Sequence, residues 1–237
     1  PNGEKYDLYI GSLGKIYGNF NSSYLFENSS ATMINLDNFY TDFITNFQGM
    51  FTYCLMEYLN VDNWNTSSAT NMSSMFSSCK SLEGIDLSKM DTSNVTSMSM
   101  LFYECSKLEN IDLSKINTSN VSNMKSMFYK CNALKNIDIT KMNTSNVTNM
   151  DSMFNECKSL EELEVSNWDV SSVKNMQGMF LECSSLEELD VSDWDVSNVE
   201  DMSGMFMKCV NLQDINVSDW DVSNVKDMGS MFDECKS

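Results

Sequence analysis

The chain has 237 residues, with 34 acidic and 15 basic side chains, no histidine and a formal net charge of −19 at pH 7. Such a surface repels nucleic-acid phosphates and anionic lipid headgroups and favours basic partners. Every basic residue is a lysine, so the chain lacks the guanidinium fork that often recognises phosphate. These features argue against nucleic-acid binding. Without histidine, the common Ser-His and Cys-His catalytic arrangements are also absent, so we do not expect an enzyme.

Residues 1–24 lack any repeated motif and contain two short alternating apolar segments on either side of Gly11-Ser12-Leu13-Gly14. Alternation over so short a range, with glycines between the segments, predicts a β-hairpin. This hairpin is expected to cover the apolar end of the first coil, as terminal caps of repeat arrays do. The first domain is therefore an N-terminal cap over residues 1–24.

From residue 25 to residue 237 the chain repeats one motif, mostly with a period of 26 residues. Cysteines mark the copies at Cys54, Cys79, Cys105, Cys131, Cys157, Cys183, Cys209 and Cys235. In a worn first copy, Ser29 takes the cysteine position. A unit this short cannot bury its own apolar face, so about eight copies must stack into a solenoid. The last copy stops in mid-repeat, and we expect the chain to be a fragment whose C-terminal end is truncated.

Each repeat contains two apolar segments. In the first, Leu82, Ile85 and Leu87 form an LxxIxL pattern that predicts a short strand. In the second, after a polar Ser-Asn corner, apolar residues recur three to four positions apart, as at Val95 and Met98. This spacing predicts a short helix or a 3₁₀-rich arc. We therefore expect an α/β fold, a right-handed solenoid like that of leucine-rich repeats. Its parallel sheet is expected on the concave side, with short helices or 3₁₀ turns on the convex side.

The repeated text MFxxCxxLxxIDLSxxDTSNVxxM, present with small changes from Met50 to Cys235, resembles the BspA-like leucine-rich-repeat proteins of bacterial cell surfaces. The opening YDLYIGSLGKIYGN is similar to the segment that precedes such repeats. The resemblance implies a cell-surface or secreted binding protein, often associated with adhesion to host proteins or other cells. It implies no catalytic residues. We expect no cofactor, with Ca²⁺ as the open alternative. We expect a monomer without a membrane-spanning segment, and an end-to-end dimer through the bare C-terminal coil stays an alternative.

Three repeated columns invite a chemical role but are better interpreted as core. The cysteines form no CxxC pair, so we interpret them as reduced packing residues, with disulfides between neighbouring coils as the alternative. The 20 methionines recur on the side of the arc that must face the core. The tryptophans Trp64, Trp168, Trp194 and Trp220 share their column with Met and Ile, which favours burial over an exposed sugar or peptide platform.

Acidic residues on the strand supply the candidate binding site. One outward column holds Asp86, Asp112, Asp138, Glu164 and Asp190, with Asn60 and Asn216 at its ends. Lysines follow three positions later in the N-terminal coils, as at Lys89 and Lys115, but not in the C-terminal coils. Like charges on adjacent strands destabilise a sheet, so something should offset them. A second acidic column, which includes Asp91 and Asp169, precedes the Ser-Asn corner and is assigned a local turn role.

The uncompensated acids predict that the C-terminal coils engage a basic protein surface or recruit divalent cations such as Ca²⁺. The candidate partner-binding residues are Asp112, Asp138, Glu162, Glu164, Glu188, Asp190, Asp214 and Asn216. Solvated charge that keeps a long solenoid soluble is the alternative. The expected function is a non-enzymatic adhesion module that recognises a host or neighbouring-cell protein through its concave face. A structural stalk that displays another domain is the second hypothesis.

Overall fold

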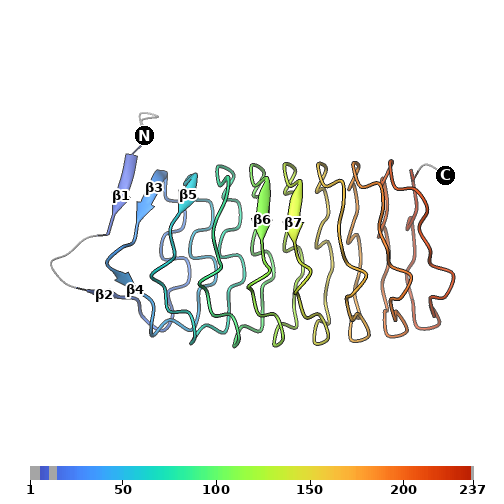
Figure 1. Ribbon diagram of the computed structural model, residues 1–237, viewed down its shortest axis with the longest axis horizontal. Coiled ribbons are helices and arrows are strands. Elements are labelled where there is room, and N and C mark those ends of the chain that lie inside the picture. The colour runs from blue at the N-terminus through green and yellow to red at the C-terminus, as the bar shows by residue number, and fades with distance from the viewer. Residues whose placement is uncertain (1–5, 11–14, 236–237) are drawn as a thin grey trace.

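The chain winds into an elongated solenoid in the computed structural model, which describes residues 6–10 and 15–235 (Figure 1). Its strands are short: β1 (Tyr6–Tyr9), β2 (Ile16–Tyr17), β3 (Ala31–Asn35), β4 (Phe39–Tyr40), β5 (Tyr58–Leu59), β6 (Asn110–Asp112) and β7 (Asn136–Asp138). They form three parallel sheets, ordered β1-β3-β5, β2-β4 and β6-β7. Every strand therefore pairs with the equivalent segment of a neighbouring coil, which is the arrangement that a stacked repeat requires.

The described part of the N-terminal segment forms a coil of the array, so the predicted hairpin is wrong. β1 pairs in parallel with β3, β2 pairs in parallel with β4, and β1 and β2 are not paired with each other. The proposed turn at residues 11–14 lies outside the described residues. Stacking wins over local pairing because Leu8 and Ile16 pack against the core of the next coil. An isolated two-stranded hairpin would leave these side chains in water.

The segment predicted as a short helix or a 3₁₀-rich arc is a series of tight turns, and residues 6–10 and 15–235 contain neither an α-helix nor a 3₁₀-helix. In the segment 72–79, the N–H groups of Met75, Ser77 and Cys79 donate to the carbonyl three residues back, at 3.0–3.3 Å. The N–H groups between them donate to the next coil, as from Ser74 to the Ser99 carbonyl at 2.8 Å. In an α-helix, each of these N–H groups would donate to a carbonyl four residues back in the same segment. Half of them donate to the next coil instead, which excludes an α-helix. The fold is consequently all-β within these ranges, and the α/β assignment is wrong.

Residues with left-handed backbone make these turns possible. The φ angle is +56° at Ser74 and +57° at Ser78, and both positions keep a positive φ in later coils. A positive φ at the third residue of a four-residue turn is typical of a type II turn. Glycine occupies the first of these positions at Gly178 and Gly204, where φ is +54° and +61°. Consecutive turns repeat every few residues, much as a helix does, and this similarity produced the wrong prediction.

The cysteine column lies in the core and makes a repeated hydrogen bond. The Cys105 thiol donates to the Phe76 carbonyl at 3.1 Å, and the same carbonyl accepts the Cys79 N–H at 3.2 Å. All eight cysteines are free, and seven of them are buried. Burial raises the pKa of Cys54 to about 11 and that of Cys209 to about 12. The column therefore consists of reduced thiols, as the sequence predicts, and it also supplies donors that bind one coil to the next.

Two aromatic columns show that the coils diverge across the core. Phe76 and Phe102 stack with their ring centroids 5.5 Å apart and their planes 12° apart. On the other side of the core, Trp168 and Trp194 are also nearly parallel, but their centroids are 6.5 Å apart. These tryptophans are 3–4% exposed, so burial of this column is confirmed. The wider tryptophan spacing indicates that the array is bent.

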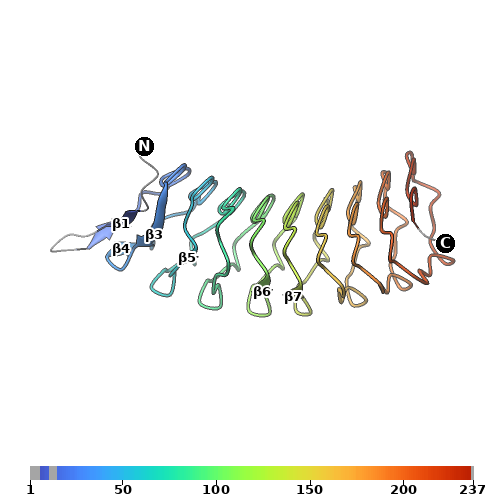
Figure 2. The ribbon, with the colours of Figure 1, turned by 90° about the horizontal axis from the view of Figure 1, so that it is seen from above.

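The bend has the opposite sense to the predicted one. We call the side formed by segments such as 72–79 the turn face, and the side formed by segments such as β6 and β7 the strand face. Figure 2 shows the turn face along the inner, concave edge and the strand face along the outer, convex edge. On the turn face, parallel bridges continue without a break from Asn21 to Asp227. The expected concave sheet is therefore wrong: the close ladder belongs to the turns, and pairing on the more open strand face is discontinuous.

Candidate binding surface

The predicted partner-binding residues lie together on the strand face, in two adjoining shallow hollows. The first hollow, of about 730 Å³, is lined by Asp112, Asp138, Glu162 and Glu164 above an apolar floor that includes Ile111, Ile137 and Leu163. The second, of about 470 Å³, shares Glu162 and Glu164 and adds Glu188, Asp190, Asp214 and Asn216. The structure thus brings all eight residues to one surface that crosses successive coils.

The acids in these hollows are unpaired with cations among the described residues. Glu162 and Glu188 are both exposed and lie on adjacent coils that are joined by a parallel bridge. Lys135, which lines the first hollow, pairs with Glu109 at 3.3 Å. Stacking therefore holds like charges on neighbouring coils, and negative potential accumulates over the hollows.

The outward column has a structural role that the sequence analysis assigned only to the second column. Oδ1 of Asp190 accepts hydrogen bonds from the N–H and the hydroxyl of Ser192, at 3.1 and 2.7 Å. These bonds lower the pKa of Asp190. Asp112 has the same arrangement with Ser114, which lowers the pKa of Asp112. Each carboxylate therefore stays ionised while it closes a local turn, and its other oxygen can contact a partner.

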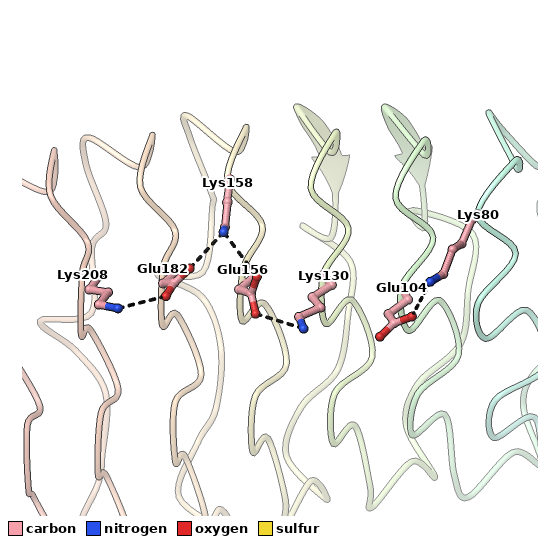
Figure 3. Close-up of polar contacts among 7 residues, drawn as sticks. All are labelled: Lys80, Glu104, Lys130, Glu156, Lys158, Glu182 and Lys208. Carbon is pink, nitrogen blue, oxygen red and sulfur yellow. Dashed lines mark hydrogen bonds and ion pairs between the residues drawn. The ribbon is translucent and has the colours of Figure 1, made fainter.

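The turn face has a different electrostatic pattern, in which positive and negative side chains alternate (Figure 3). The ion pairs in this view join Lys80 with Glu104, Lys130 with Glu156, Lys158 with both Glu156 and Glu182, and Lys208 with Glu182, at 3.0–3.4 Å. Solvent still reaches these pairs, whose glutamates are only partly buried, so each contributes only about 0–1 kcal/mol to stability. Their main effect is local neutralisation, which leaves the strand face as the more negative side of the C-terminal coils.

A group of aromatic rings near the N-terminus was missed by the sequence analysis. We call it the aromatic corner, and it consists of the exposed rings of Tyr17, Phe20 and Phe43 and the half-buried ring of Tyr40. The Tyr17 ring lies 5.5 Å from Tyr40 and 5.7 Å from Phe43, and Phe43 lies 6.4 Å from Phe20, measured between centroids. Phe20 and Phe43 are 65% and 53% exposed. The missed signal is in the repeat itself: later coils carry polar residues where these two rings stand.

The described ranges contain neither a metal-binding cluster nor a membrane-spanning helix. No group of three or more cysteine, aspartate or glutamate side chains there is arranged to hold a metal ion. Over the same ranges, no helix has the length and apolar character needed to cross a membrane.

Comparison with known proteins assigns the repeats to a family. The family model described as "Mycoplasma protein of unknown function, DUF285" matches residues 20–137 and 133–237. The chain belongs to the DUF285 family. No curated protein matches it. The family match does not name the BspA-like branch, so that finer resemblance stays a prediction.

Solved structures similar to this DUF285 chain include two bacterial proteins. A leucine rich cell surface protein from Faecalibacterium prausnitzii has 15% identity and a TM-score of 0.47, with 90% of this chain and 60% of that chain covered. A leucine-rich repeat protein from Bacteroides ovatus has 18% identity and a TM-score of 0.41, with 97% and 76% covered. The DUF285 chain therefore spans less than two thirds of the first protein's length.

The DUF285 match begins at Phe20, so the coil that contains β1 and β2 precedes the matched region. The aromatic corner straddles this boundary, because Tyr17 lies before it and Phe43 lies after it. The eight predicted partner-binding residues, in contrast, lie wholly within the matched repeats.

Proposed function

We propose that this chain is a non-enzymatic binding module of a bacterial cell surface, and that it recognises a basic protein of a host or neighbouring cell. The contact surface is the strand face of the C-terminal coils. The observation that carries the proposal is the clustering of unpaired acids over the two hollows, whereas turn-face acids such as Glu156 and Glu182 are paired with lysines. The resemblance to BspA-like surface proteins supports the proposed location.

The hollows suit long basic side chains. A lysine or arginine can place its methylene stem on an apolar floor such as Ile137 and Leu163 and direct its charge to Glu162 or Glu164. Because these carboxylates are exposed, each contact is weak and is screened by salt. Affinity would come from several coils acting together, so binding should be fast and should weaken steeply as ionic strength rises.

The test uses Glu162→Lys with Glu188→Lys, which we call the hollow variant. Unlike Asp112 and Asp190, these two glutamates close no turn with their side chains, so charge reversal leaves the local turns intact. The matched control is Asp193→Lys with Asp219→Lys, which changes the same net charge at exposed sites in nearby coils outside the hollows. Binding to purified extracellular proteins that range from acidic to basic is measured by surface plasmon resonance at two salt concentrations. We expect basic proteins to bind, the hollow variant to lose at least tenfold in affinity, and the control to lose much less. Equal losses in the two variants would contradict a specific surface.

A structural stalk is the second candidate, and the unbroken bridge ladder of the turn face favours it. Neighbouring coils joined at every turn resist bending, so the array could act as a stiff spacer. Failure of every basic protein to bind at low salt would favour this role over recognition. The stalk hypothesis also predicts that the hollow variant leaves function unchanged.

A further inference from the structure

The fold does not require the rings of the aromatic corner. When the coils are superposed by their repeat, Phe43 stands in the column of Ser68 and Asn94, and Phe20 stands in the column of Thr45 and Thr70. These polar residues support the same corner in later coils. Exposed aromatic side chains in columns that are otherwise polar are a surface feature, and contiguous exposed apolar patches commonly mark a binding site.

One ring of the corner already holds a cation from the chain itself. The Lys15 ammonium lies over the Tyr40 ring, 4.5 Å from its centroid. The faces of Phe20 and Phe43 have no such cation among the described residues, although both rings are more than half exposed. The negative face of an aromatic ring attracts a cation, and Lys15 shows that the local geometry permits this contact.

The charge around the corner also favours a cationic ligand. Residues 6–60 contain five acids, of which Asp42 directly precedes Phe43, but Lys15 is their only basic residue. The field therefore attracts positive groups and repels anionic ones. Arginine stacks on aromatic rings better than lysine does, and this chain has no arginine of its own. Arginine at this corner must come from a partner.

We propose that the aromatic corner is a docking site for arginine side chains of a basic protein segment. This inference deepens the proposed function, because the same basic partner would contact acids on the strand face and rings at the corner. The two contacts differ in physical character. The strand face gives long-range, salt-sensitive attraction, whereas ring stacking is short-range and depends little on salt.

The test replaces two rings by residues that the repeat itself uses, in the double variant Phe20→Thr with Phe43→Ser. The probes are the labelled peptides (Gly-Arg)₆ and (Gly-Lys)₆, measured by fluorescence anisotropy. Each exposed cation–π contact corresponds to about a two- to fivefold effect, so two independent rings give roughly 4- to 25-fold weaker binding of the arginine peptide. We expect a smaller loss for the lysine peptide and an unchanged salt dependence.

The matched control is Tyr9→Asn, which removes a 65% exposed ring outside the corner and installs the residue type of its strand partner Asn35. It should leave both affinities unchanged. Unaltered binding of the arginine peptide by the corner variant would overturn the proposal. So would binding of (Gly-Pro)₆ or maltohexaose by the wild-type chain as tightly as the arginine peptide, because neither ligand is cationic.

The hollow variant, Glu162→Lys with Glu188→Lys, separates this inference from the proposed function. If the hollow variant binds normally but the corner variant loses arginine affinity, the corner proposal stands and the proposed binding role of the strand face fails. The reverse result overturns the corner alone. Should the double corner variant fold poorly, wild-type ring proton shifts on titration with N-acetyl-arginine amide decide the matter, and unshifted Phe20 and Phe43 signals overturn the proposal.

Discussion

Replacing Cys131 by alanine tests the thiol column, since Cys131 is fully buried and its thiol donates to the Phe102 carbonyl at 3.1 Å. Alanine removes this donor and also leaves a space where the sulfur was. The lost hydrogen bond costs about 1 kcal/mol and the incompletely collapsed space costs roughly another 1 kcal/mol. We expect Cys131→Ala to lower the free energy of unfolding by about 2 kcal/mol.

Cys131→Ser is the informative partner variant, because serine keeps a donor of similar size and Ser29 already occupies the equivalent position in the first copy. It should cost about half as much as alanine. Urea denaturation followed by circular dichroism measures the stability of both variants. Long repeat arrays can depart from two-state unfolding, so the free energies are compared only if both variants show the same dependence on urea concentration. If serine destabilises the protein as much as alanine does, the thiols act by packing alone and the donor role is refuted.

Three further predictions concern other repeated positions. At pH 8 a thiol reagent should modify the partly exposed Cys235 much faster than Cys54, because burial raises the pKa of Cys54 to about 11. Mass spectrometry measures the rate of modification at each cysteine, and similar rates would show that the coils open readily. Gly178→Ala should lower stability by about 1 kcal/mol in thermal melts, because φ is +54° there and the new methyl would lie 3.3 Å from the Asn155 side-chain nitrogen; an unchanged melting temperature contradicts the backbone argument. Ser192→Ala removes the hydroxyl that lowers the pKa of Asp190, so NMR titration should find this pKa closer to 3.8, and no rise would show that the bond is absent in solution.

The columns of the core were predictable because substitution within each column reveals burial. Trp168 alternates with Met142 and Ile116 at one position, and only an apolar environment suits all three. The cysteines follow the same logic, and their free, buried state agrees with the prediction. Their hydrogen bonds to phenylalanine carbonyls were not predictable, because the acceptors belong to the preceding coil and depend on how closely the coils approach.

The turn face was mispredicted because periodicity records which side chains face the core, and not which backbone groups pair. Val95 and Met98 have a helical spacing, yet the positive φ of Met100 (+56°) and Glu104 (+55°) ends any helix at once. Neither residue is a glycine, so the sequence gives no local warning of this conformation. The direction of bending was also mispredicted, because the closely spaced bridges between these turn segments form the concave edge of the array.

The candidate site was predictable in its membership but not in its location. Repeat spacing alone brings Glu162 and Glu188 to adjacent coils, so their proximity follows from the period. The hollows arise from the spread of the coils on the outer edge, which follows from the bend. The aromatic corner was missed because the prediction used the features that the repeats share. Residues such as Phe43, which replaces a polar residue of the repeat, are not among them.

The alternating bonds of the turn face have a consequence for how such a chain can change its length. Every second N–H group in a turn segment donates to a carbonyl of the adjacent coil. Inserting one residue there would place N–H groups opposite N–H groups along the rest of that segment. Gaining or losing a complete unit leaves every rung matched. The shortened interval between Cys54 and Cys79 fits this rule, since the turn segments at its two ends remain bonded to each other, as from Phe51 N–H to the Met75 carbonyl at 2.9 Å. Recombination between copies should therefore lengthen or shorten the protein in whole-unit steps, which would move the acidic surface outward or inward without remaking it.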